Sequence, residues 1–166
     1  MERDDVEQAF AWDDPYDIVL ALVHLTDERM ARQNLSWAEL SIGERVVIHV
    51  NWFDNEVANG GFHQFFTNAS GNEENWTAIL NSLQQIKAVH TVALIEEAVA
   101  AFPEDFRPKN SEKTWDYLLS QGAEVIEILE AVSARYFQQA EQVYALAAKF
   151  LLSRKQDFLR VDPDAH

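Results

Sequence analysis

One histidine lies in a setting that could support catalysis. His63 belongs to the run Gly60-Gly-Phe-His-Gln-Phe-Phe66, and a histidine can act as a general base near neutral pH. A hydrolase or transferase could combine it with Glu56 or Asn59. Such a reaction also needs an oriented partner and a pocket, and the chain has no GxGxxG, Walker, HExxH or GxSxG motif that would supply them.

The aromatic residues around His63 have a simpler interpretation. Phe62, Phe65 and Phe66 recur at helical spacing, and aromatic residues so spaced usually fill a core. We therefore expect them to pack beneath a break in the helix while His63 and Gln64 point outward. On this interpretation we predict that the chain has no catalytic residues, is not an enzyme and needs no cofactor.

A metal site is the second chemistry to consider. His24 and Glu28 lie one helical turn apart and could bind a metal together, but two ligands without a third make a weak site. Cysteine is absent, so thiolate ligands, thiol nucleophiles and disulfides are excluded. We predict a surface histidine beside an acid, and no metal.

The charge of the chain is its most unusual property. The 166 residues contain 28 Asp and Glu against 13 Lys and Arg, which gives a net charge of −15 and a pI near 4.5. Nucleic acids and anionic membranes carry the same sign and are repelled. We therefore expect no direct nucleic acid binding and no membrane binding, and a basic protein as the natural partner.

The acids are concentrated in a few segments. Residues 2–28 hold nine acids and one base, and Glu124, Glu127 and Glu130 recur every third residue. On a helix these three would form a ridge nearly opposite the apolar residues of the same segment, with about 4.5 Å of rise between neighbours. Such a ridge loosely resembles the phosphate row of a DNA strand, which advances about 3.4 Å per phosphate. The open alternative is that the acids serve solubility alone.

The carboxylates that we predict to imitate phosphates are Glu124, Glu127 and Glu130 first, then Asp13, Asp14 and Asp17, then Glu96 and Glu97. The apolar residues expected opposite the ridge are Val125, Ile128, Leu129 and Val132. The bases gather late in the chain, at Lys149, Arg154, Lys155 and Arg160, where they could pair with the acidic arm within a chain or across a dimer.

The elements that must position these groups are helices almost throughout. Asp14 and Pro15 are typical of a helix start, and residues 36–39 and 41–44 both fit the capping box. Apolar residues at spacings of three or four predict a helix from Ile42 to a break at Asn59-Gly-Gly61. Further helices are expected over 15–32, 76–86 and 89–101, and two or three over 111–159 with a break at Gly122.

We therefore predict an all-α fold, a compact multi-helix single domain with a strongly acidic surface. An irregular acidic arm would occupy residues 1–13, the domain 14–160 and a tail 161–166, with residues 103–108 as the clearest linker. A hydrophobic content of 48% excludes a disordered chain. No signal peptide and no apolar run of about 18 residues is present, so we expect a cytoplasmic protein.

The run from Asn51 to Gly71 resembles a known family. It resembles the bacterial DNA-mimic proteins of about 19 kDa, whose pattern is Glu-Val-x-Asn-Gly-Gly-Phe-x-Gln-Phe-Phe-x-Asn-x-Ser-Gly. The residues that match are Glu56, Val57, Asn59, Gly60, Gly61, Phe62, Gln64, Phe65, Phe66, Asn68, Ser70 and Gly71. The likeness extends over about residues 40–160, and we assign the motif a structural role.

The resemblance implies an acidic, all-helical homodimer that occupies the DNA-binding face of a helix-turn-helix transcription factor. Such a protein would act in transcription regulation as an anti-repressor, by protein–protein interaction. The alternative is an acidic helical interaction or scaffold domain without DNA mimicry, whose partner meets its aromatic surface. Salt would weaken the first kind of complex steeply, whereas apolar docking would persist.

Overall fold

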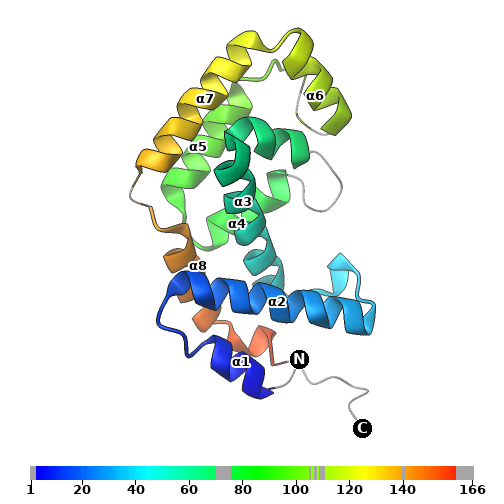
Figure 1. Ribbon diagram of the computed structural model, residues 1–166, viewed down its shortest axis with the longest axis vertical. Helices are drawn as coiled ribbons and strands as arrows, with labels where there is room; N and C mark the ends of the chain where they lie inside the picture. Colours follow the sequence, from blue (N-terminus) through cyan, green and yellow to red (C-terminus); the bar gives the residue numbers. More distant parts are fainter. Residues whose placement is uncertain are drawn as a thin grey trace. The chain divides into compact units, whose positions relative to one another are not determined.

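The computed structural model describes residues 3–69, 76–104, 106, 108, 111–139 and 141–159, and within these ranges it contains helices and no strand (Figure 1). The α-helices are α1 (Arg3–Ala9), α2 (Pro15–Gln33), α3 (Ile42–Asn68), α4 (Trp76–Gln85), α5 (Val89–Ala100), α6 (Ser111–Ser120), α7 (Ala123–Gln138) and α8 (Val143–Leu152). Two short 3-10 helices are η1 (Trp37–Glu39) and η2 (Lys155–Asp157). The predicted all-α class is confirmed. The predicted tail 161–166, Arg160 and the motif residues Ser70 and Gly71 lie outside the described residues.

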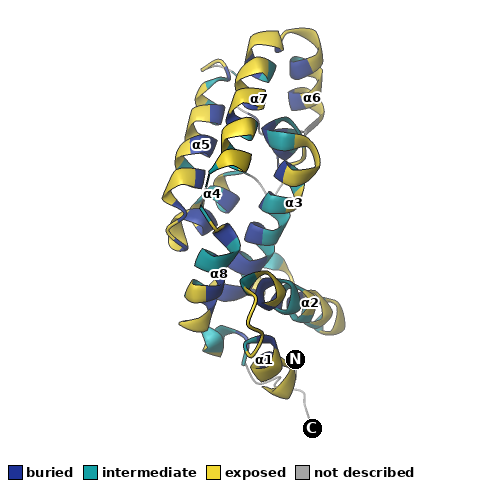
Figure 2. Ribbon diagram, turned by 60° about the vertical axis from the view of Figure 1, so that its left-hand side comes forward, coloured by how far each residue is buried: buried dark blue, intermediate teal, exposed yellow. Residues whose placement is uncertain are grey.

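The helices gather in two compact units. Unit 1 is Met1–Asn51 with Gln142–His166, and unit 2 is Trp52–Glu141, so that α3 contributes to both. In unit 1, α2 packs against α1 and α8; in unit 2, α5 packs against α4 and α7, and α6 packs against α7. The segment 103–108, which the sequence marked as the clearest linker, connects α5 to α6 inside unit 2. The helices are amphipathic, and Figure 2 shows α5 and α7 each with exposed residues along one side and buried residues along the other.

Unit 1 corrects the expectation of an irregular acidic arm. Residues 3–9 form α1, with Val6 and Ala9 buried. The ammonium of Lys155 forms an ion pair with Glu7 and lies 5.4 Å from the ring centre of Phe10. The prediction was wrong because it was based on the acidity of the segment. Val6 and Ala9 lie three positions apart, a spacing that already fits one buried helix face. Of the late bases, Lys155 pairs with the acidic segment within one chain, whereas Arg154 pairs with Asp157.

The start of α2 follows its predicted chemistry. Asp14 has extended backbone geometry and its carboxylate accepts a hydrogen bond from the backbone N–H of Tyr16 at 2.8 Å, while Pro15 occupies the first helical position. The helix ends at Asn34, whose φ of 50° is the left-handed conformation that asparagine tolerates. Ile18, Val19 and Leu22 form the buried face.

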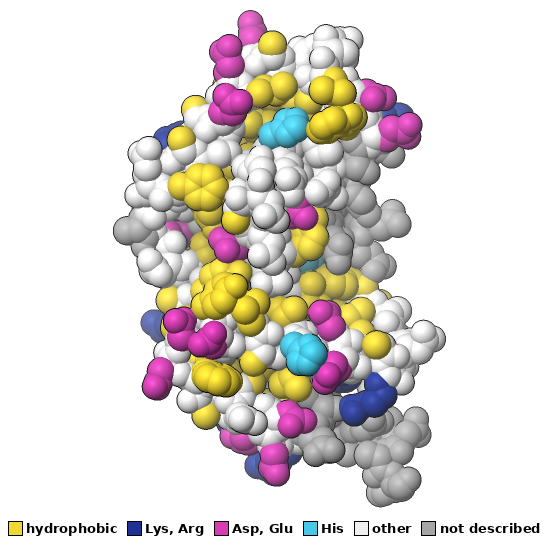
Figure 3. Space-filling model, viewed as in Figure 1, with side chains coloured by type: hydrophobic (Ala, Val, Ile, Leu, Met, Phe, Trp, Pro, Cys, Tyr) yellow, Lys and Arg dark blue, Asp and Glu magenta, His cyan; other side chains and the backbone are white. Residues whose placement is uncertain are grey.

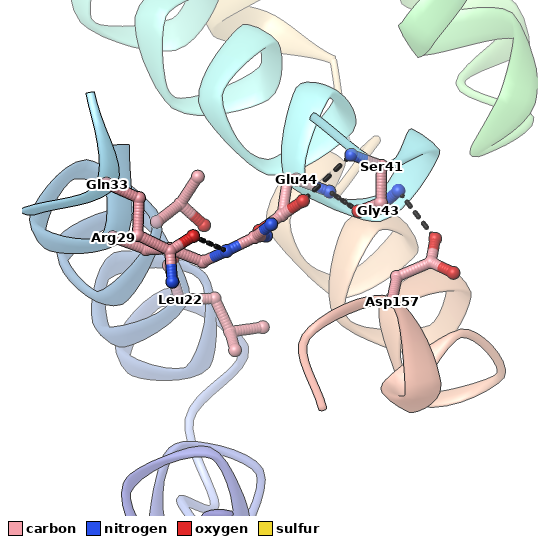
Figure 4. A network of polar contacts seen from close by, with 8 residues as sticks. Leu22, Arg29, Gln33, Ser41, Gly43, Glu44 and Asp157 are labelled. Atoms are coloured by element: carbon pink, nitrogen blue, oxygen red, sulfur yellow. Dashed lines mark hydrogen bonds and ion pairs between the residues drawn. The ribbon is translucent and has the colours of Figure 1, made fainter. Parts of the chain in front are cut away.

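A polar network fixes the start of α3 (Figure 4). Ser41 and Glu44 form the predicted capping box: the Ser41 hydroxyl accepts from the Glu44 N–H at 3.1 Å, and the Glu44 carboxylate accepts from the Ser41 N–H at 2.8 Å. The same carboxylate is fully buried and forms an ion pair with Arg29 of α2. Asp157 of η2 adds a second cap, because its carboxylate accepts from the Gly43 N–H at 2.8 Å. The start of α3 is thereby bound both to α2 and to η2, two parts of unit 1 that are far apart in the sequence.

In unit 2, a carboxylate distant in sequence caps α5. The N-cap position is Ala88, whose side chain cannot accept a hydrogen bond. The carboxylate of Glu141 accepts instead from the N–H groups of His90 at 3.1 Å and Thr91 at 2.7 Å, and from the Thr91 hydroxyl at 2.6 Å. The acid thus connects the segment after α7 to the start of α5. Within the ranges described above, no helix combines the length and apolar character needed to cross a membrane.

The buried ion pair gives the first prediction. Replacing Arg29 by Met leaves the Glu44 carboxylate buried without its cation, and we expect unfolding to become easier by about 3 kcal/mol. Urea denaturation followed by circular dichroism measures this. Arg32→Met changes an exposed arginine of the same helix and is expected to cost under about 0.5 kcal/mol. Equal midpoints for the two variants would contradict the structural role of the pair.

Candidate functional site

The candidate site begins at a break inside α3. Gly60 has φ −153° and ψ 22°, and Gly61 has φ 66° and ψ −166°, so the helical path is interrupted where Asn59-Gly-Gly61 was expected to end it. The positive φ belongs to the second glycine, Gly61, and not to Gly60. The conformation of Gly61 is accessible almost only to glycine. A Cβ atom on Gly60 would also lie 2.7 Å from the Cβ of Gln64.

A serine of α7 holds the break in place. The interruption leaves the N–H of Phe62 without its helical acceptor, and the hydroxyl oxygen of Ser133 accepts from it at 2.9 Å. The Ser133 hydroxyl in turn donates to the Leu129 carbonyl at 2.6 Å. A Cβ atom on Gly61 would lie 2.5 Å from the same hydroxyl oxygen. The second glycine is therefore required for this close approach as well as for its backbone angles.

Glu56 joins the two sides of the break. Its carboxylate accepts hydrogen bonds from the side-chain amides of Gln64 at 2.8 Å and Asn68 at 2.7 Å. These three residues all belong to the Glu-Val-x-Asn-Gly-Gly-Phe-x-Gln-Phe-Phe-x-Asn-x-Ser-Gly pattern and lie within α3. Asn59, by contrast, is exposed at the last position before the glycines. The motif therefore builds a supported helix break.

The aromatic residues of the motif form the core of unit 2. Phe62, Phe65 and Phe66 are fully buried. Phe62 and Phe65 pack edge-to-face against Phe53 and against each other, and Phe65 packs in the same way against Phe66, at centroid distances of 4.9 to 6.1 Å. The rings of Phe62 and Phe66 are tilted, with centroids 6.2 Å apart. The ring of Tyr136 lies 5.5 Å from that of Phe53. The predicted burial of these phenylalanines is confirmed. Their neighbours His63 and Gln64, which were expected to point outward, are half-buried, and the side-chain amide of Gln64 donates to Glu56.

His63 does not meet the partners that a hydrolase would need. Its ring lies 5.7 Å from that of Trp115, while the carboxylate of Glu56 is already engaged by the two amides. Ser133 lines the same groove as His63, but its proton is directed to the Leu129 carbonyl. A serine nucleophile must instead direct its proton to the base. The geometry therefore gives the catalytic alternative no support.

The predicted ridge is present on α7. Glu124, Glu127 and Glu130 are all exposed, and within the part of the chain that the structure describes no ion pair joins them to a base. Opposite them Val125, Leu129 and Val132 are buried as expected, whereas Ile128 is 39% exposed. At 100° per residue, Ile128 lies farther around the helix from the centre of the buried face than Val125, Leu129 and Val132 do, which accounts for its exposure. The three carboxylates therefore stand on one helix as accessible charges.

The other candidate carboxylates fall into two groups. Asp13, Asp14 and Asp17 are exposed at the start of α2 in unit 1, where Asp14 also caps the helix. Glu96 and Glu97 are exposed on α5 of unit 2. The structure thus places Glu96, Glu97 and the ridge in one unit, because α5 packs against α7.

Glu97 differs from the others because it is paired. Its two carboxylate oxygens accept from the guanidinium of Arg135 at 2.9 and 2.5 Å. These hydrogen bonds, aided by the charge of Arg135, hold the pKa of Glu97 below its ordinary value. No local sequence pattern predicts this contact, because Arg135 lies 38 positions away. A carboxylate neutralised in this way is a weaker phosphate imitation than the three on α7.

The metal hypothesis finds only a surface pair. His24 and Glu28 approach to 3.1 Å with side chains 73% and 62% exposed. Among the residues with described positions, no group of three His, Asp or Glu side chains could hold a metal ion. The pair matches the expectation of a surface histidine beside an acid.

An all-α chain with a net charge of −15 and a row of exposed carboxylates on one helix has the features of an acidic, protein-binding class. The chain belongs to the DMP19-like protein family, whose model matches residues 38–154. This is a family of DNA-mimic proteins. Neither a curated protein nor a solved structure matches the chain.

The support of the helix break can be tested at Ser133. Ser133→Ala leaves the Phe62 N–H without its acceptor, and we expect a loss of about 1–3 kcal/mol in unfolding free energy. Thermal and urea denaturation measure it. Ser120 is the matched control, since its hydroxyl donates to the Asp116 carbonyl four residues earlier but, among the described residues, accepts no hydrogen bond from another helix. If Ser120→Ala destabilised the protein as much, the break would not depend on the serine.

The pairing of Glu97 predicts a pKa change. In Arg135→Gln the pKa of Glu97 is expected to rise toward its ordinary value, because the hydrogen bonds and the nearby charge that lower it are removed. In the wild type the folded-state pKa is the lower one, so the pair stabilises the fold at neutral pH and this contribution is lost as the pH falls through that pKa. Carbon-detected NMR titration measures both proteins. The pKa of Glu39, lowered by hydrogen bonds from Ser36, should stay low in both.

Proposed function

We propose that this protein is a DNA mimic whose carboxylates bind the DNA-binding surface of a helix-turn-helix transcription factor and keep that factor from its operator. It would thereby act as an anti-repressor in transcription regulation, in the cytoplasm and as a homodimer. Membership of the DNA-mimic family is the observation that carries the proposal. No catalytic step, cofactor or direct contact with nucleic acid forms part of it.

The carboxylate row of α7 supports this role. Glu124, Glu127 and Glu130 follow one another with about 4.5 Å of rise on a helix, so their relative positions are set by the backbone. Their buried opposite face anchors the helix to unit 2. Lys and Arg side chains that normally contact phosphates could bind these carboxylates. The carboxylate row would not have to become ordered on binding.

Charge also explains how the partner would be found and released. A net charge of −15 steers a basic surface toward the protein at low salt and weakens the complex as salt is added. The same charge keeps the protein away from DNA, so operator DNA and this protein would compete for one surface of the factor. Competition of this kind distinguishes mimicry from an ordinary interaction domain.

The proposal is tested by capture and competition. The protein, immobilised, is exposed to cytosol at low salt, and bound proteins are eluted with a salt gradient and identified by mass. The expected result is a helix-turn-helix regulator that salt releases and that its own operator DNA displaces. A partner without a DNA-binding role, or one indifferent to salt, would leave an acidic interaction or scaffold domain instead.

The site is tested with the regulator so identified. Changing Glu124, Glu127 and Glu130 together to Lys should weaken binding at least about tenfold, because attraction becomes repulsion at three points. The matched control changes three exposed acids outside the candidate set, Asp4, Glu28 and Glu104, to Lys. Both variants alter net charge equally, so equal losses in titration calorimetry would show that only total charge matters. Retained affinity in the first variant, with a cooperative melt, would remove α7 from the site.

A further inference from the structure

A groove lies beside the carboxylate row in unit 2. It has a volume of about 510 Å³ and is formed where the break in α3 faces one side of α7. Gly60, Gly61 and His63 line it from α3, and Ile126, Glu130, Ser133, Ala134 and Phe137 line it from α7. Since the two glycines have no side chains, the break itself keeps this space open.

Apolar side chains are unusually exposed around the groove. Phe137, in its wall, is 59% exposed. Trp115 of α6, which contacts the His63 ring, is 45% exposed, and Leu119, one turn farther along α6, is 66% exposed. Figure 3 shows hydrophobic side chains gathered about a histidine over α6 and α7, with carboxylates at the margin. Exposed apolar side chains gathered around a groove commonly mark a binding surface.

Carboxylates of α7 border this surface. Glu130 lies in the groove wall together with the ring of His63 from α3, and Glu127 precedes Glu130 by about one turn on the exposed side of α7. The Ser133 hydroxyl is held by Phe62 and Leu129, and so offers a ligand little hydrogen bonding. The groove is therefore apolar with a negative margin. Its chemistry fits an apolar side chain flanked by Lys or Arg.

We propose that the groove receives an apolar side chain from a basic amphipathic helix of the DNA-binding partner, while Glu127 and Glu130 bind the basic residues that flank it. The inference rests on the proposed function and adds the chemistry of the partner's contact. Charge complementarity selects this occupant. A second copy meeting the same surface about a two-fold axis would bring two carboxylate-bearing margins together, and like charges repel.

The groove thereby makes an apolar contact with the DNA-binding partner that DNA itself does not make. The carboxylates govern the approach and the salt dependence, whereas burial of an apolar side chain in the groove adds affinity that salt does not screen. A partner lacking that side chain would be bound weakly even if it were equally basic. The groove thus discriminates between DNA-binding proteins, whereas a row of charges alone discriminates poorly between partners that are equally basic.

The test uses two synthetic helical peptides with fluorescent labels. One has leucines along one face and arginines along the other; the second carries serine at every leucine position and the same charge. By fluorescence anisotropy, the wild-type protein is expected to bind the leucine peptide at least about fivefold more tightly, as expected for one buried apolar side chain. The difference should persist at raised salt. Equal affinity for the two peptides would overturn the proposal.

Variants then locate the binding surface. Phe137→Ser should remove the preference for the leucine peptide, and Leu119→Ser should reduce it. Leu152→Ser changes a leucine that is 51% exposed on α8, in unit 1, and should leave the preference intact. A melt of each variant establishes that it is folded. An unchanged preference in folded Phe137→Ser would overturn the assignment to this groove.

The two proposals fail separately. The peptide preference reports on the groove without any regulator or operator, whereas displacement by operator DNA reports on mimicry. A regulator that is captured and displaced as expected, from a protein that binds both peptides equally, would leave the mimic function standing and remove the groove. The reverse result would leave a docking surface for apolar, basic helices on a protein that is not a DNA mimic.

Discussion

The break in α3 and its support by Ser133 are the constraint on which unit 2 depends. A helix cannot be interrupted in a buried place without a new partner for the N–H that it releases, and one hydroxyl supplies this for Phe62. The interruption also lets the three motif phenylalanines continue the core after the helix changes direction. On its outer side the same pair of glycines leaves space, so one local feature both completes the core and opens the groove.

The acids of the chain fall into two physical classes. Some are structural: they cap helices, bind a buried cation or join two sides of a turn, and their oxygens are already engaged by N–H groups or bases. These structural acids include Asp14, Glu39, Glu44, Glu56, Glu141 and Asp157. Others, among them Glu124, Glu127 and Glu130, are exposed and form no ion pair within the described part of the chain. They repel one another, which costs stability and keeps charge available for a partner. The proposed function concerns the second class, and net charge alone does not separate the two.

Helix α7 presents different surfaces on different sides. Val125, Leu129 and Val132 fix it to the core, a second side carries the carboxylates, and a third borders the groove. The 3.6-residue period of the helix separates these functions by angle without separating them along the chain. Rigid attachment of a charged helix is what a mimic of a stiff polymer requires, since a mobile row of charges would have to be ordered on binding.

The sequence by itself determined most of the helices, though not α1, because capping residues, apolar periodicity and glycines act over a few positions. Asp14, the Ser41–Glu44 box and the break at Gly60-Gly61 were all predictable. It also indicated the buried phenylalanines, the exposed ridge and, through the motif, the family. Only the tertiary structure decided that α1 packs against α2 and that Glu97 pairs with Arg135. It also decided that Ser133 accepts the free N–H at the break in α3 and that the groove forms beside it. These depend on contacts between residues 38 to 148 positions apart, which no local pattern encodes.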